Sequence, residues 1–237
     1  MKNIIFGTTH FAEMMYYYLS ETSKKVCAFT VNEKYISDIS LPCDIIPFEE
    51  LDKYYHKEEC KIIPAIGYFD MNDRRKSVFA QIKNKGYYID NFIHPTSCVA
   101  KNVEMGYGTI ILENTVIQPF VKIGTGNIFM SNITVSHNSQ IGDYNWFAPG
   151  TTMSGNVIIK DNCFLGSNCT VKNEIKIEDY TLIGAGSYVS KDTKSHQLIK
   201  PMKSMYIDDI VYSKFWFFVY WQKFLVYLNL YKINIPY

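Results

Sequence analysis

A bulky apolar residue recurs at every sixth position of the chain, from Ile93 through to Val189. With 47% hydrophobic residues overall, seventeen such positions in succession would arise by chance about once in a few hundred thousand trials. A period of six fits neither a helix, which repeats every 3.6 residues, nor a half-buried strand, which alternates every second residue. The pattern instead predicts a repeating unit of one short strand and one tight turn.

The positions around each apolar residue support this interpretation. The next residue is often Gly, Ala or Ser, and the fourth residue after it is mostly small or β-branched. Three units would close a triangular coil, with the bulky side chain filling the interior and the small residue after it permitting the turn. Successive coils would stack about 4.8 Å apart through parallel backbone hydrogen bonds. The repeat therefore predicts a parallel β-helix.

Strand and helix patterns alternate before the repeat begins. Residues 2–7 and 61–67 form apolar runs typical of strands, and residues 8–20 and 72–85 have helical spacing. Such alternation predicts a small α/β unit with a parallel sheet. The first strand ends in a single glycine, where a dinucleotide fingerprint needs three, so NAD binding is disfavoured. The helix that follows still favours phosphate at its N-terminus, which leaves a nucleotide-linked ligand open.

The pattern breaks after Val189, and the chain ends in an aromatic-rich segment. Residues 206–237 hold 12 aromatic residues, against 25 in the rest of the chain. We expect a helix that packs on the β-helix or on a neighbouring subunit. An interfacial membrane anchor and an unpacked tail are the alternatives, the former because lysines are interspersed with the aromatics. The predicted domains are thus 1–90 (α/β), 91–195 (β-helix) and 196–237 (C-terminal extension).

Charge and cysteine usage exclude several classes of protein. A net charge of +1 argues against a nucleic-acid-binding surface. The six cysteines are scattered without a CxxC pair, and no apolar targeting segment precedes the first strand, so we expect reduced thiols in a cytoplasmic protein. Cysteine and histidine are not clustered at ligand spacing, and no metal is expected. No uncharged apolar run is long enough to predict a spanning helix.

His137 is the candidate for chemistry on the coils. It comes two residues after a core position, so its side chain should point away from the coil. Imidazole titrates near neutral pH and can accept a proton from an attacking amine or hydroxyl. An isolated surface histidine is often inert, and the spacing alone does not decide between the two roles. Cys163 and Cys169 occupy the small inward position, where we expect packing rather than a nucleophile.

The repeat region as a whole, residues 93–191, resembles the hexapeptide acyltransferases. The segments 136–144, 154–159, 162–168 and 182–187 resemble the NeuD/PglD-like sugar acetyltransferases in particular. That family pairs a small Rossmann-like N-terminal domain with a left-handed β-helix. The resemblance implies a homotrimer whose active sites lie between adjacent β-helices, with acetyl-CoA and a nucleotide-activated sugar as partners.

The resemblance also implies roles for single residues. His137 falls on the catalytic base, and Gly155 falls where a backbone N–H binds the thioester oxygen. Asn138 and Trp146 stand where the family usually has Glu and His, which predicts an altered sugar pocket. The family's usual ending is replaced at 198–203, so contacts to the adenine end of CoA are not carried over. The remaining implied residues are Gly166, Ser167, Gly184 and Ala185 for pantetheine, and Gly7, Thr8, Gly67, Tyr68 and Asn72 for the nucleotide sugar.

The resulting hypothesis is acetyl transfer from acetyl-CoA to the amino group of a nucleotide-linked amino(deoxy) sugar used in surface glycans. O-acetylation of a sugar hydroxyl is an alternative within the same fold. A third hypothesis belongs to another class: a non-catalytic trimeric scaffold whose segment 206–237 contacts a membrane or a glycosyltransferase.

Overall fold

The computed structural model describes residues 1–202 apart from residues 23 and 38. The predicted aromatic C-terminal helix and its membrane or partner contact lie outside the described residues. Met1–Pro201 form one compact unit. Within it, none of the helices has the length and apolar character needed to cross a bilayer.

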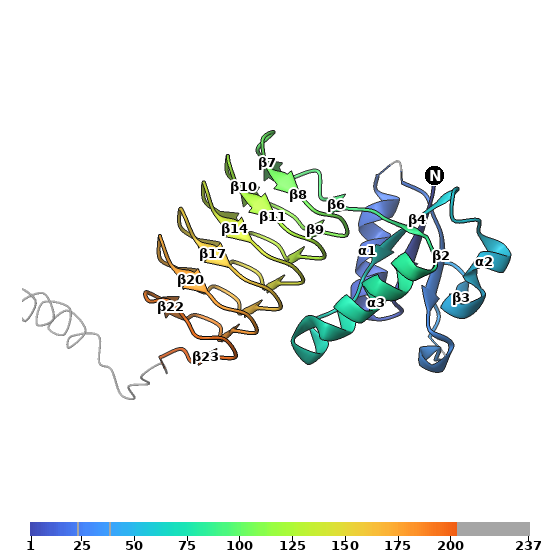
Figure 1. Ribbon diagram of the computed structural model, residues 1–237. Coiled ribbons are helices and arrows are strands. Elements are labelled where there is room, and N and C mark those ends of the chain that lie inside the picture. The colour runs from blue at the N-terminus through green and yellow to red at the C-terminus, as the bar shows by residue number, and fades with distance from the viewer. Residues whose placement is uncertain (23, 38, 203–237) are drawn as a thin grey trace, which may run out of the picture. The chain divides into compact units, whose positions relative to one another are not determined.

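The N-terminal part is a five-stranded parallel sheet in the order β3-β2-β1-β4-β5, as the strand–helix alternation predicted (Figure 1). The core residues of β1 are buried on both faces, because Ile5 packs with Met15 of α1 and Phe6 packs with Phe79 of α3. A sheet covered on both faces explains the continuous apolar runs of its central strands. The elements are β1 (Lys2–Phe6), α1 (His10–Ser20), β2 (Val26–Val31), β3 (Ile45–Pro47), α2 (Leu51–Tyr54), β4 (Cys60–Pro64), α3 (Asp73–Asn84) and β5 (Tyr88–Ile89), with short 3₁₀ turns η1 (Glu33–Tyr35), η2 (Phe48–Glu50) and η3 (Phe69–Asn72).

Two-residue strands then follow one another around a triangular coil and form three parallel sheets, numbered here in the order in which the chain visits them. Sheet 1 contains β6 (Phe92–Ile93), β9 (Ile110–Ile111), β12 (Ile128–Phe129), β15 (Trp146–Phe147), β18 (Phe164–Leu165), β21 (Leu182–Ile183) and β23 (Leu198–Ile199). Sheet 2 contains β7 (Cys98–Val99), β10 (Val116–Ile117), β13 (Thr134–Val135), β16 (Thr152–Met153), β19 (Thr170–Val171) and β22 (Tyr188–Val189). Sheet 3 contains β8 (Glu104–Met105), β11 (Lys122–Ile123), β14 (Gln140–Ile141), β17 (Ile158–Ile159) and β20 (Lys176–Ile177).

The bulky residues that the repeat predicted fill the interior of the coils. From Ile111 to Val189, every sixth residue is buried, and the Phe129 and Phe147 rings stack with centroids 4.5 Å apart. The first coil differs, because no further coil covers its open end: Ile93 is 43% exposed. The last coil extends past residue 195, since β23 pairs with β21 through Leu182 and Leu198.

The predicted position of the turn residue is wrong. From Gly108 to Gly186, every sixth residue has a positive φ, and it lies three positions after the bulky residue rather than one. Most of these residues are Asn or Gly, which tolerate the left-handed region. The small residue directly after the bulky one instead allows close stacking. A Cβ added to Gly124, for example, would lie 2.6 Å from the carbonyl oxygen of Gly142 in the next coil.

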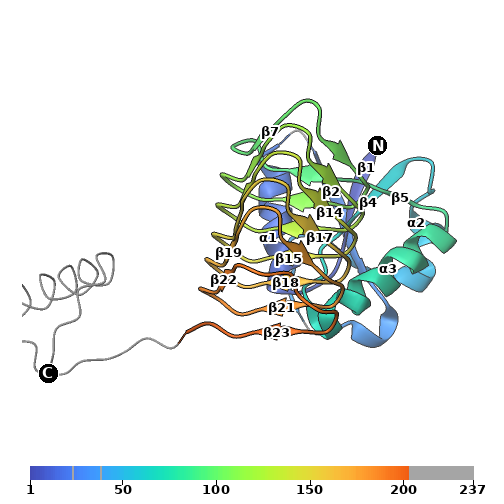
Figure 2. The same cartoon turned by 60° about the vertical axis from the view of Figure 1, so that its left-hand side comes forward.

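The outer surface of sheet 1 joins the coils to the N-terminal part (Figures 1 and 2). Its outward side chains are apolar at every step, whereas those of sheets 2 and 3 are largely polar, and the first four are buried with Ala12 and Met15 of α1. The coils therefore have their own inner core, and the outer face of sheet 1 also forms part of a second core together with the N-terminal part. These four residues are Phe92, Ile110, Ile128 and Trp146.

Replacing the central ring of the interior tests the stacked core. Phe147→Ala should lower the free energy of unfolding by about 3–5 kcal/mol, because a fully buried ring is lost and a cavity is left behind. Denaturant unfolding of the full chain measures the difference. Lys101→Ala, on an exposed turn of the first coil, should change stability by no more than about 0.5 kcal/mol. A Phe147 variant as stable as this control would contradict the packed interior.

Candidate functional site

A cavity of about 300 Å³ lies at the carboxyl ends of β1, β2 and β4. In a parallel sheet of this order, the strand order reverses between β1 and β4, and ligands bind in the crevice at that point. The structure thus brings together Gly7, Thr8 and Gly67 of the predicted nucleotide-sugar residues. The lining also contains Phe6, Thr9, Val31, Asn32, Tyr35, Ser37, Ala65, Ile66, Phe69, Arg74 and Val78.

The cavity combines a cation with flat apolar walls. The guanidinium of Arg74 lies 4.3 Å from the ring centre of Tyr35 and 5.7 Å from that of Phe69. Thr9 is the N-cap of α1, so the positive end of the helix dipole faces the same region. Gly7 has a φ of +135°, and a Cβ there would lie 2.7 Å from the carbonyl oxygen of Ala65. These features suit a ligand that carries an anionic group and a planar ring.

Tyr68 and Asn72 lie outside this cavity, at the junction with the coils. Tyr68 packs edge-on against Trp146 and Phe164, with both centroid distances 5.1 Å. Asn72 is fully buried, and its side-chain amide donates to the carbonyl oxygen of Cys163 at 3.1 Å. Asn72 therefore holds the N-terminal part on the coils, and its side chain does not line the cavity.

Arg75 is a residue that the sequence reasoning missed. It is fully buried, and its guanidinium donates to the carbonyl oxygens of Gly126 (2.9 Å), Tyr144 (2.8 Å) and Asn145 (3.1 Å) in the coils. The same group donates to Gly67 (3.2 Å), a residue of the cavity lining. Burial lowers the pKa of Arg75 to about 9, which still leaves the group charged at neutral pH. Arg75 thereby fixes one wall of the cavity to the β-helix.

His137 and Gly155 lie one above the other at the corner between sheets 2 and 3. The carbonyl oxygen of His137 accepts a hydrogen bond from the backbone N–H of Asn156 (3.0 Å), which sets the two turns in register. A Cβ added to Gly155 would lie 2.7 Å from Cε1 and 2.8 Å from Nε2 of the imidazole. The ring therefore rests directly on the Gly155 backbone, and only glycine leaves room for it.

In the exposed imidazole, one nitrogen is oriented by a hydrogen bond, and the other has no hydrogen-bond partner among residues 1–202, apart from 23 and 38. Nδ1 of His137 lies 3.1 Å from Oδ1 of Asn138, an oxygen that can only accept a hydrogen bond. The tautomer with the proton on Nδ1 satisfies this contact and leaves Nε2 unprotonated. The backbone N–H of His137 donates to Oε1 of Gln118 at 3.0 Å, which anchors the turn from the preceding coil.

The residues assigned to pantetheine lie on a different corner, between sheets 1 and 2. Gly166 and Gly184 stack on consecutive coils, and a Cβ on Gly166 would lie 2.5 Å from the backbone nitrogen of Ala185. Ser167 is half-buried and Ala185 is exposed beside them. Within one chain, this corner and the His137 corner are separate.

Trp146 is also apart from His137, because it is buried on the outer face of sheet 1.

The two inward cysteines are not available as nucleophiles at neutral pH. Burial raises the pKa of Cys163 to about 12 and that of Cys169 to about 11, so both thiols are neutral. The Sγ–H of Cys163 donates to the carbonyl oxygen of Glu178 at 3.1 Å. Over residues 1–202, excepting 23 and 38, no three His, Cys, Asp or Glu side chains gather closely enough to hold a metal ion.

Comparison with known proteins identifies the repeat. Residues 138–173 and 156–191 match the family model described as bacterial transferase hexapeptide (six repeats). A search of curated proteins finds no match.

Solved structures with the same fold cover nearly the whole described unit. PerB from Caulobacter crescentus, in complex with CoA and GDP-perosamine, has a TM-score of 0.73 at 21% identity, with 84% of this chain and 92% of that chain covered. The acetyltransferase domain of PglB from Neisseria gonorrhoeae has a TM-score of 0.74 at 18% identity, covering 83% and 95%. WeeI from Acinetobacter baumannii has a TM-score of 0.66 at 19% identity, covering 84% and 95%. Residues 138–191 are thus bacterial transferase hexapeptide repeats, and Met1–Pro201 share the fold of these solved structures, an α/β domain followed by a left-handed β-helix.

Proposed function

We propose that this protein is a cytoplasmic, acetyl-CoA-dependent N-acetyltransferase that acts on a nucleotide-linked amino(deoxy) sugar destined for a surface glycan. The observation that carries the proposal is the imidazole of His137 resting on the Gly155 backbone, with Nε2 free and exposed. A base and a backbone N–H donor then stand side by side on rigid coils, which is the pair of groups that acyl transfer to an amine requires.

The reaction is a direct transfer. The amine nitrogen attacks the thioester carbonyl carbon, the new N–C bond forms, and the C–S bond to CoA breaks. Nε2 of His137 accepts the proton that the amine loses and passes it to the departing CoA sulfur. The N–H of Gly155 has no hydrogen-bond partner among the described residues, so it is available to the oxygen on which negative charge develops.

Two copies of the chain complete the site in this proposal. The pantetheine residues Gly166 and Ala185 and the base His137 stand on different corners of the triangular coil. A homotrimer of packed coils would set one copy's His137 corner against a neighbour's pantetheine corner. The cavity that contains Gly7 and Arg74 would hold the nucleotide of the acceptor. PerB, bound to CoA and GDP-perosamine, is a protein of this fold that holds both kinds of ligand.

Asn138 and Trp146 give the site its own character. Asn138 orients the imidazole through its side-chain oxygen at 3.1 Å, as the usual Glu would, but it carries no charge that would stabilise the imidazolium. Trp146 lies between Phe11 and Tyr68, with centroid distances of 5.7 and 5.1 Å. It acts through this packing, and any contact with the sugar would come from its 7% exposed edge.

Removal of the base tests the mechanism. His137→Ala should lower turnover by about 10²- to 10⁴-fold, because general base catalysis contributes that much. Acetyl-CoA binding, measured by calorimetry, should not change. Release of the CoA thiol, measured with a panel of nucleotide amino sugars and their hydroxyl counterparts, gives the rate and identifies the nucleophile. His56→Ala, an exposed histidine of the N-terminal part, is the matched control.

Three outcomes would contradict parts of this proposal. Full turnover in His137→Ala would remove the base from the mechanism. Activity only with hydroxyl acceptors would favour O-acetylation. If the wild type releases no thiol with any acceptor and binds no acetyl-CoA, the scaffold hypothesis is favoured.

A methyl group at position 155 should displace the imidazole. In Gly155→Ala, the added Cβ overlaps Cε1 and Nε2 of His137, so the ring must rotate off the backbone. We expect turnover to fall by at least about tenfold, since small misplacements of a catalytic group are costly. The NMR resonances of the His137 ring protons should shift, while Ser154→Ala leaves them in place. Unchanged resonances in Gly155→Ala would show that the ring does not rest on this backbone.

Substitution of Arg74, the cation of the cavity, tests whether the nucleotide sugar binds there. Arg74→Ala should raise the KM for the nucleotide sugar by about tenfold or more, because a hydrogen bond from a charged group contributes roughly 1.5–3 kcal/mol. The KM for acetyl-CoA should stay the same. Arg74→Lys retains the charge but loses the planar stacking on Tyr35, so its KM for the nucleotide sugar should lie between those of the wild type and Arg74→Ala. Equal KM values in all three proteins would place the nucleotide elsewhere.

A further inference from the structure

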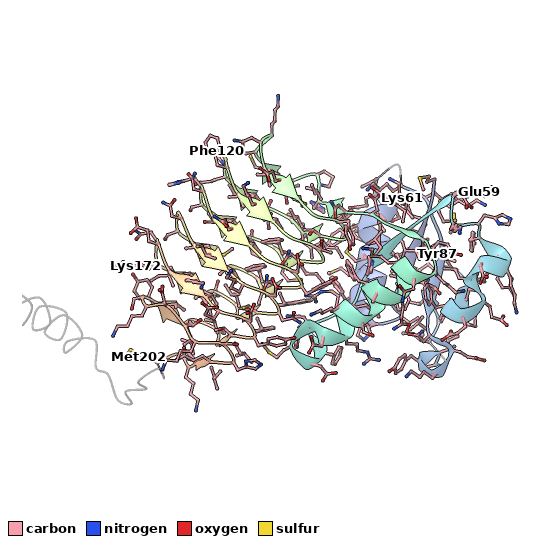
Figure 3. The ribbon with its side chains drawn as sticks, viewed as in Figure 1. Glu59, Lys61, Tyr87, Phe120, Lys172 and Met202 are labelled. Carbon is pink, nitrogen blue, oxygen red and sulfur yellow. The ribbon has the colours of Figure 1, made fainter. Side chains whose placement is uncertain are left out.

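Phe120 is an exposed aromatic residue in a strained conformation. Its φ is +66°, in the left-handed region that most turns of these coils fill with Asn or Gly, and it is 63% exposed. A bulky residue with positive φ is an outlier that the surroundings normally stabilise. Figure 3 shows Phe120 at the outer edge of the stack, away from the N-terminal part.

The other aromatic residues in this conformation have partners within the chain. Tyr144 packs edge-on against Phe79, with centroids 5.4 Å apart. Tyr180 stacks on His196 at 4.8 Å, and its hydroxyl donates to Asp73 at 3.0 Å. Phe120 has no aromatic neighbour among the described residues. Aromatic packing against the residues that the structure describes therefore does not explain why a phenyl ring stands at this turn.

Phe120 belongs to the same corner as His137. The two residues before it contact the His137 turn: Gln118 accepts a hydrogen bond from the His137 N–H at 3.0 Å, and Pro119 accepts one from the Asn138 N–H at 3.3 Å. Because residues one coil apart lie above one another, Phe120 stands directly next to Asn138, on the side opposite Gly155.

The position of Phe120 relative to the acetyl donor indicates which ligand its ring would contact. The residues assigned to CoA all belong to coils after His137, from Gly155 to Ala185, whereas Phe120 belongs to the coil before it. The acceptor must reach the thioester from the side that CoA leaves open. An aromatic face also suits a deoxy sugar, which presents an apolar surface of C–H groups.

We propose that Phe120 is an acceptor-specificity residue whose ring packs against the C–H face of the amino sugar next to His137. This inference rests on the proposed function and deepens it. The coil turn sets the positive φ, as at every sixth residue, and the phenyl ring is retained at this unfavourable position because it contacts the acceptor.

Substitution by the residue that neighbouring turns use tests the proposal. Phe120→Asn removes the ring and suits a positive φ, as Asn132 and Asn156 show. The KM for the nucleotide amino sugar should rise about tenfold or more, the loss typical of a missing apolar contact in a binding pocket. The KM for acetyl-CoA should not change, and the thermal unfolding midpoint should stay equal or rise.

Glu174→Asn is the matched control, because Glu174 is another exposed, positive-φ residue of this corner, two coils after Asn138. It should leave the acceptor KM unchanged, and Phe120→Tyr should restore a KM close to that of the wild type. Light scattering on each variant reports the oligomeric state.

Each outcome decides a separate point. An acceptor KM that is the same in Phe120→Asn and the wild type overturns the inference while leaving the proposed function intact. Loss of the oligomer in Phe120→Asn without a change in acceptor KM also overturns it, and assigns the ring to contact with a second copy. A wild type that acetylates none of the acceptors counts against the proposed function, and this inference then falls with it.

Discussion

Parallel backbone pairing between successive coils is the constraint on which this structure depends. Each short strand bonds to the strand one full turn earlier, as in the pairing of Ile117 with Val135, so every residue lies over its counterpart one coil away. This register stacks Phe129 on Phe147 in the interior, and it sets the imidazole of His137 on the backbone of Gly155 at the surface. The geometry of the candidate site therefore follows from the same hydrogen bonds that hold the coils together.

The link between the two parts of the described unit has a different origin. The apolar outer row of sheet 1 packs with α1. The guanidinium of the buried Arg75 donates hydrogen bonds to five backbone carbonyl oxygens, which belong to both the N-terminal part and the coils. A buried cation without a carboxylate partner is stable only when its donors are satisfied, and here they are satisfied by backbone groups whose positions the coils already determine. Gly67, in the cavity wall, thus takes its position from the β-helix.

The separation of the corners explains how such a fold could bring two substrates together. The described part of the chain presents an imidazole beside a backbone N–H that has no partner within that part at one corner, a row of small residues at another, and a cavity at the edge of the α/β sheet. None of the three alone is sufficient for acetyl transfer. In the proposed trimer, packing of identical coils brings one corner of a chain against a different corner of its neighbour. The same repeat sequence can therefore supply both the donor-binding and the acceptor-binding residues.

The β-helix, its interior and the parallel α/β unit could be predicted from the amino-acid sequence, because a strict period of six and a buried strand run are local consequences of how each segment packs. The sequence also pointed to Gly7, Thr8 and Gly67, which the structure brings into one cavity. It did not locate the turn residue, since a Gly or Ser required for close stacking looks the same as one required for a turn. The place of Asn72, the burial of Arg75 and the exposure of Phe120 emerged from the folded molecule alone, because each depends on how segments far apart in the chain pack together.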